Sequence, residues 1–98
     1  MDVAAVIATL RAHRPELEAM GIAHAGVFGS VARGEAGPGS DIDILVEFAP
    51  GQPGDIYAYV GVQEQVASLF PGRVDVVDRG SLRPRLRGHV LADLIHAF

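Results

Sequence analysis

The chain has 98 residues, 49% of them apolar, and a formal net charge of −4 at pH 7. This length predicts one domain, residues 1–98, with a single modest core. Proteins that bind nucleic acid non-specifically use a basic surface, so direct nucleic-acid binding is not expected of this acidic chain. The chain contains no cysteine, which excludes disulfides and thiolate metal sites and suits a reducing, cytoplasmic location.

The N-terminal part predicts two short helices followed by a strand. Asp2 is placed to cap a helix with apolar residues at helical spacing, and Pro15 should end or kink that helix. A second helical turn stops at Gly21, and residues 22–28 read as a strand in which Gly26 allows close backbone approach. Charges interrupt the first apolar stretch and no basic segment precedes it, so neither a signal peptide nor a membrane span is expected.

Residues 41–48 predict a second strand that begins with two aspartates. Apolar residues alternate with Asp41 and Asp43, so both carboxylates share one face, about 6–7 Å apart. Two carboxylates this close repel each other unless a cation lies between them, and Mg²⁺ is commonly held by one or two carboxylates plus substrate phosphates. Taken alone, an Asp-x-Asp pair is more often a pair of solvated charges at a strand edge.

The segment between these strands, residues 29–40, contains a candidate phosphate site. Gly29 and Ser30 leave the first strand, and Ser30 is predicted to cap a short helical turn whose free N–H groups suit phosphate. Arg33, one turn later, would add a charge-assisted contact to the same anion. An ordinary strand-to-helix turn is the alternative interpretation of the Gly-Ser pair.

The remaining sequence predicts a helix, a third strand and a final helix. Asp55 is placed to cap a helix that ends near Pro71, and residues 73–77 read as the third strand. Ser81 is predicted to cap the last helix, whose buried stripe would consist of four apolar residues spaced by four: Leu82, Leu86, Val90 and Leu94. This order predicts an α/β fold, a small mixed sheet packed by helices.

Asp75 completes the candidate site. It lies between Val74 and Val76 in a strand that reads as core, where an aspartate is unfavourable without a function or a partner. If the third strand neighbours the second, Asp75 joins the aspartate pair on one sheet face. Asp78 has the opposite parity and is expected to shape the turn into the last helix.

Other residues give weaker signals. Five arginines gather around the last helix, and they suggest either a docking surface or, more often for such a pattern, a solvated helix face: Arg73, Arg79, Arg83, Arg85 and Arg87. Tyr57 and Tyr59 are expected to pack rather than to stack on a base. The four histidines show no metal-ligand spacing, and Glu47 lies too far along its strand to join the site.

The motifs GSVARGEAGPGSDIDILV and RVDVVD together resemble the minimal nucleotidyltransferases, a branch of the DNA polymerase β superfamily. The resemblance covers nearly the whole chain and includes the order of helices and strands. The positions that match the family motif are Gly29, Ser30, Arg33, Gly34, Ser40, Asp41, Asp43 and Asp75. The resemblance implies the nucleotidyltransferase fold, which is like the palm of polymerase β.

The resemblance also implies a mechanism with two Mg²⁺ ions and ATP as the substrate. Asp41 and Asp43 would hold the ions that grip the triphosphate, and Asp75 would help to hold the catalytic ion and promote deprotonation of the attacking hydroxyl. The nucleotide itself would be bound by four motif residues: Gly29, Ser30, Arg33 and Ser40. The reaction expected from the family is transfer of AMP.

Small members of this family act as antitoxins that add AMP to a tyrosine of a HEPN-domain RNase toxin, so the resemblance implies such a partner. Two alternatives stay open. The first is a binding module that neutralises its partner by complex formation without catalysis. The second is an enzyme that transfers a nucleotide to a small molecule or an RNA end.

Overall fold

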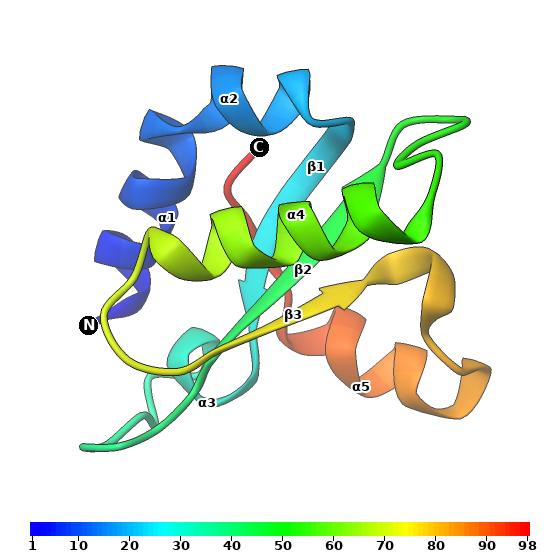
Figure 1. The fold of residues 1–98 in the computed structure, drawn as a ribbon. Helices are drawn as coiled ribbons and strands as arrows, with labels where there is room; N and C mark the ends of the chain where they lie inside the picture. Colours follow the sequence, from blue (N-terminus) through cyan, green and yellow to red (C-terminus); the bar gives the residue numbers. More distant parts are fainter.

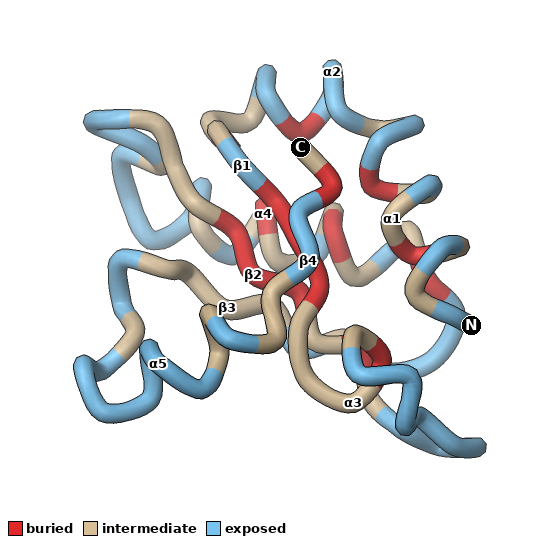
Figure 2. Tube along the Cα trace, turned by 180° about the vertical axis from the view of Figure 1, so that it is seen from behind, coloured by how far each residue is buried: buried red, intermediate tan, exposed pale blue.

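The computed structural model describes residues 1–98 and contains one four-stranded sheet with the strand order β3-β2-β1-β4. Figure 1 labels β1, β2 and β3, and Figure 2 also labels β4. The strands are β1 (Ile22–Phe28), β2 (Ile42–Phe48), β3 (Val74–Asp78) and β4 (Ile95–His96). The helices are α1 (Val3–Ala12), α2 (Arg14–Ala19), α3 (Gly29–Ala32), α4 (Ile56–Ser68) and α5 (Pro84–Asp93), with a 3-10 turn, η1 (Arg79–Ser81). Strand β1 pairs antiparallel with β2 and β4, whereas β2 pairs parallel with β3. The predicted α/β fold with a mixed sheet is confirmed.

One face of the sheet carries the hydrophobic core. The alternate residues Ile42, Ile44 and Val46 of β2 are buried against side chains from α1, α2 and α4. Helix α4 crosses this face in Figure 1, and it buries Val62 and Val66 there. The opposite face of β2 therefore presents its odd-numbered residues, and these include the acidic ones.

Several local predictions are confirmed. The Asp2 carboxylate accepts a hydrogen bond from the N–H of Ala5 (2.9 Å), and Asp55 caps α4 in the same way through the N–H of Ala58 (2.8 Å). Gly26 is needed for close approach, because a Cβ there would lie 2.6 Å from the carbonyl oxygen of Ile95 in β4. That short fourth strand has no pattern of its own in the sequence and was not predicted.

Two predicted caps are wrong. Ser30 lies inside α3, which starts at Gly29 and has no side-chain cap. Ser81 lies in η1, and α5 starts at Pro84 without a side-chain cap. The carboxylate of Asp78 explains the second case, since it accepts hydrogen bonds from the N–H of Gly80 (2.9 Å) and the hydroxyl of Ser81 (3.2 Å). Asp78 thus shapes this turn, as predicted.

The predicted buried stripe of the last helix is also wrong. No residue of α5 is buried, and Leu86 is 48% exposed. Figure 2 shows α5 as mostly exposed, beside the buried central strands. The core is already filled from the other face by α1, α2 and α4, so α5 has only the polar face and the short edge of the sheet to pack on.

The longest helix, α4, has 13 residues, and no helix of the chain combines the length and the apolar character that crossing a membrane requires.

Replacing leucines by alanine should show that α1 contributes to the core and that α5 does not. Leu10→Ala, at a fully buried position of α1, should lower the free energy of unfolding by about 2–5 kcal/mol, because it leaves a cavity. The matched change Leu86→Ala in α5 should lower it by less than about 1 kcal/mol, since that side chain is half exposed. Urea denaturation measures both, and equal losses would contradict the position of α5.

Candidate functional site

The parallel pairing of β2 with β3 brings two aspartates into register. Asp43 is the Cα partner of Asp75, so both side chains lie on the same face of the sheet. Asp41 directly precedes β2 and has the same parity as Asp43. The predicted juxtaposition of the three carboxylates at one end of the sheet therefore agrees with the strand register.

The electrostatics of Asp43 show how close these charges are. Partial burial raises the pKa of Asp43 above its ordinary value of 3.8, and the negative charges of Asp75 and Asp41 raise it further. The positive charge of Arg33 acts in the opposite direction. This end of the sheet therefore holds a carboxylate that is disfavoured in its ionised form by two like charges.

Asp75 reaches this position differently from the sequence expectation. The strand β3 is an edge strand, and Asp75 is exposed rather than part of a core. Only its neighbours Val74 and Val76 pack against the core, from the other face. An exposed aspartate on an edge strand needs no buried partner, so its candidate role depends on its register with Asp43 and not on a desolvation argument.

Gly29 lies directly against the carboxylate of Asp43. Its φ is +72°, a conformation that favours glycine, and a Cβ at this position would overlap the Oδ2 atom of Asp43. Helix α3 starts here, and the first N–H groups of a helix have no partner inside it. The backbone at Gly29 and Ser30 thus supplies donors next to the aspartates, although the helix itself has only four residues.

Arg33 is held by two carboxylates. Its Nε lies 3.0 Å from Oε2 of Glu35, and its Nη1 lies 2.6 Å from Oδ2 of Asp93 at the end of α5. Both bonds raise the pKa of Arg33 above its ordinary value. Glu35 and Asp93 were not singled out in the sequence, and no local pattern links Asp93 to an arginine 60 residues away.

The loop that leads to Asp41 is closed on itself. The hydroxyl oxygen of Ser40 accepts a hydrogen bond from the N–H of Gly37 (2.9 Å), and the residue is exposed. Arg73, which the sequence suggested as part of a docking surface or of a solvated helix face, places its Nε 3.7 Å from Oδ1 of Asp41. The parallel register explains this contact, because Arg73 precedes β3 as Asp41 precedes β2.

The carboxylates of Asp41, Asp43 and Asp75 are suitable ligands for a hard divalent cation, but their side chains alone do not form a complete coordination site. No group of three or more histidine or acidic side chains forms a ready metal-binding cluster. Mg²⁺ commonly takes only one or two protein carboxylates and completes its shell with water and substrate phosphate. Asp41, Asp43 and Asp75 supply such carboxylates, and their mutual repulsion is what a cation would relieve.

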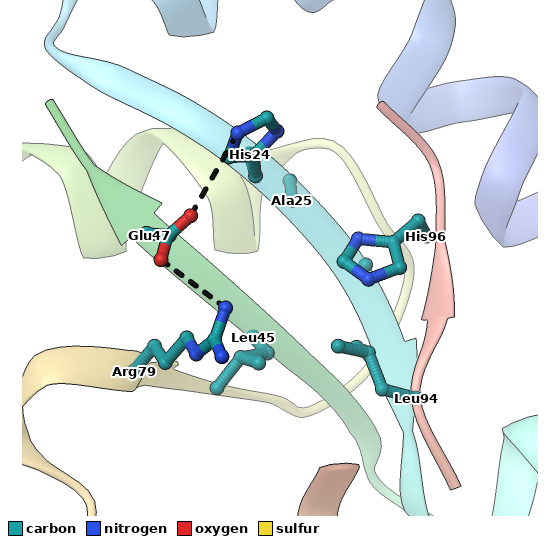
Figure 3. Close-up of a pocket in the computed structure, with 8 residues that line it drawn as sticks. His24, Ala25, Leu45, Glu47, Arg79, Leu94 and His96 are labelled. Carbon is teal, nitrogen blue, oxygen red and sulfur yellow. Dashed lines mark hydrogen bonds and ion pairs between the residues drawn. The ribbon is translucent and has the colours of Figure 1, made fainter.

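A second group of charged residues lies at the other end of the same sheet face, around a small pocket that also contains His96 (Figure 3). The carboxylate of Glu47 lies 3.2 Å from Nη1 of Arg79 and 3.8 Å from Nε2 of His24. Glu47 is thus paired within the chain, which agrees with its exclusion from the candidate site. Tyr59 packs as expected, with its ring centroid 6.0 Å from that of Phe48. The same expectation is wrong for Tyr57, which is 85% exposed.

Replacing Asp43 should change the dependence of stability on pH. A group whose pKa is raised by folding stabilises the fold at low pH, and this contribution is lost as the pH rises through the raised pKa. Asp43→Asn should therefore match the stability of the wild type below about pH 3.8 and be more stable than the wild type at pH 7, by an amount that solvent screening keeps small at this partly exposed group. Thermal melts across pH 3–8 without divalent cations measure the difference. Glu64→Gln, at an exposed acid of α4, is the matched control for the loss of one carboxylate charge, and a gain of the same size in both variants would show that the surroundings of Asp43 are not the cause.

Comparisons with known proteins agree with this geometry. The family model of the nucleotidyltransferase domain matches residues 10–95. The protein adenylyltransferase MntA of Thermococcus cleftensis is 38% identical over 88 residues, which are 89% of this chain and 87% of that protein. A solved structure assigned to a minimal nucleotidyltransferase is 38% identical, covers 97% of this chain and 95% of its own, and superposes with a TM-score of 0.69.

The crystal structure of a toxin–antitoxin with AMP-PNP is also similar. It is 25% identical, covers 90% of this chain and 72% of that chain, and has a TM-score of 0.69. The match of the family model to most of the chain, together with these relatives, shows that the chain belongs to the nucleotidyltransferase domain family.

Proposed function

We propose that this chain is an antitoxin that transfers AMP from ATP to a hydroxyl group of a partner protein, a tyrosine of a HEPN-domain toxin. The observation that carries the proposal is the register of Asp43 with Asp75, with the backbone of Gly29 in contact with Asp43. The similar proteins support the substrate and the partner, since one is named a protein adenylyltransferase and another is a toxin–antitoxin with AMP-PNP.

Asp41, Asp43 and Asp75 are the proposed ligands of two Mg²⁺ ions. When bound, Mg²⁺ would stabilise the charges on the attacking and leaving oxygens of the phosphoryl group. The chain contributes the carboxylates and fixes two of them through the β2–β3 register. Their repulsion in the absence of a cation is the physical reason to expect tight coupling between metal and nucleotide binding.

The backbone N–H groups at Gly29 and Ser30 are proposed to bind phosphate oxygens, with Arg33 adding a positive charge. Ser40 is a further proposed nucleotide contact. Its hydroxyl oxygen already accepts a bond from Gly37, which leaves its O–H free to donate to a phosphate.

Asp75 is proposed to receive the proton of the attacking hydroxyl. The hydroxyl oxygen forms the new bond to the α-phosphorus of ATP, the proton passes to the Asp75 carboxylate, and pyrophosphate leaves. Because Asp75 is exposed on the edge strand, a hydroxyl on another protein can approach it without any opening of the fold. The cysteine-free composition favours a cytoplasmic location for this reaction, and that location is likewise a proposal.

The intact mass of the partner after incubation with this chain, ATP and Mg²⁺ tests the proposed reaction. The wild type should add AMP to the HEPN-domain protein, whereas Asp43→Asn and Asp75→Asn should lower the rate at least about 100-fold, because each removes a charged ligand. Asp78→Asn is the matched control, since it lies in the same strand with the opposite parity, and it should keep most of the activity.

Each alternative has its own outcome in this experiment. A stable complex with no added mass would identify a binding module and contradict the transfer. Labelled AMP that appears on an RNA end or a small molecule, and not on the partner, would contradict the choice of a protein acceptor.

Two glycines with nearly the same backbone conformation test the contact between Gly29 and Asp43. Gly29 and Gly34 have φ values of +72° and +73°, but a Cβ at Gly34 meets no atom within 4 Å. Alanine at either position should lower stability by about 1–2 kcal/mol, because an L side chain is strained there. Only Gly29→Ala should also lower AMP transfer, by at least about tenfold, since it displaces the Asp43 carboxylate. Equal activities in the two variants would show that this contact does not matter for the reaction.

A further inference from the structure

We propose that Asp93, at the end of α5, is a positioning residue that holds the guanidinium of Arg33 in place to bind the triphosphate of ATP. The inference rests on the proposed function, because it assumes that the nucleotide binds beside Asp43.

The contacts of Arg33 leave one nitrogen for a ligand. Nη1 is bound to Asp93 and Nε to Glu35, whereas Nη2 has no hydrogen-bond or ion-pair partner in the chain. The guanidinium is planar and rigid, so fixing two of its nitrogens also fixes the direction of the N–H groups on the third. A phosphate oxygen is the kind of acceptor that this arrangement suits.

Arg33 lies near the candidate site. It directly follows α3, and its N–H donates a hydrogen bond to the carbonyl oxygen of Gly29 (3.1 Å), the glycine in contact with the Asp43 carboxylate. A guanidinium on the residue one helical turn after Gly29 is placed to contribute to binding an anion beside Asp43.

Asp93 is the less exposed of the two carboxylates that hold Arg33. Its side chain is 27% exposed, compared with 64% for Glu35, which lies in a loop. The chain enters β4 two residues after Asp93, where Ile95 pairs with Val27 of β1. Since β1 also leads directly into α3, one strand fixes both ends of the contact between Arg33 and Asp93.

Charge and orientation have opposite effects on a bound triphosphate. The Asp93 carboxylate repels the phosphates, although this repulsion is screened at a partly exposed site. Its hydrogen bond immobilises a long side chain before ATP arrives, and immobilising such a side chain on binding would otherwise weaken affinity about 2- to 12-fold. We therefore expect the gain in affinity from the fixed orientation of Arg33 to exceed the loss from repulsion by Asp93.

Calorimetric titration of the full chain with AMP-PNP and Mg²⁺ tests this inference. Asp93→Ala should weaken AMP-PNP binding about 2- to 12-fold, and Asp93→Asn, which keeps one acceptor oxygen, should weaken it less. Neither change should alter binding of adenosine, which has no phosphates. In an Arg33→Gln background, Asp93→Ala should have no further effect, since a positioning residue acts only through its partner. Glu18→Ala, which removes the exposed ion pair with Arg14, is the matched control and should leave binding unchanged.

The opposite results would overturn the inference. Unchanged or tighter binding of AMP-PNP by Asp93→Ala would show that Asp93 does not orient Arg33 or that repulsion dominates. If Asp93→Ala weakens AMP-PNP binding equally in the Arg33→Gln background, Asp93 has a general structural role and does not act through Arg33. If a thermal melt shows that Asp93→Ala does not fold, Asp93→Asn takes its place in the test. Its weakening of AMP-PNP binding must then vanish in the Arg33→Gln background. A wild type that binds AMP-PNP but leaves the partner unmodified would refute the proposed function alone, whereas a wild type that binds no AMP-PNP would refute both.

Discussion

The in-register parallel pairing of β2 with β3 is the constraint on which the rest of the site depends. The register is set by the core face, where Ile42 and Ile44 lie opposite Val74 and Val76. A slip by one residue would turn these apolar side chains outward and the acidic ones into the core, which is strongly unfavourable. The hydrophobic packing on one face thus holds carboxylates together on the other, against their own repulsion.

This repulsion is tolerated because of where it occurs. Asp75 is exposed on an edge strand, and Asp41 precedes its strand, so water and ions screen both charges. Asp43 is the more buried member, and Gly29 is the residue that makes its position sterically possible. Segments more than 40 residues apart therefore meet at one carboxylate, and the stability lost there is typical of functional sites.

The sequence predicted the parts of this arrangement that short-range patterns encode. Alternation placed Asp41 and Asp43 on the face away from the core, and the caps at Asp2 and Asp55 followed from local hydrogen-bonding chemistry. Strand order is a long-range property, so the sequence could not show that Asp75 lies on an edge strand and is exposed.

The errors at the C-terminal end have the same origin. The apolar spacing of α5 predicted burial, but a helix is buried only if a free apolar surface exists to receive it, and the core face was already occupied. The contact between Asp93 and Arg33 joins residues 60 positions apart and leaves no periodic signal at all. Helix propensity predicts that a segment forms a helix, whereas the topology of the fold decides which residues that helix packs against.

The two ends of the polar sheet face differ in how their acids are compensated. Glu47 lies on the same strand and face as Asp43, yet its carboxylate is paired with Arg79 and lies near His24. Asp43 has no ion-pair partner, and its nearest charges include two further carboxylates. A sheet that needed only solubility could pair acids at both ends as it does at one. At the other end Arg73 pairs with Asp41, but neither Asp43 nor Asp75 has an ion-pair partner. These two charges therefore mark the place where a cation from outside the chain would stabilise the protein most, and where a ligand that carries phosphates would bring its own cations.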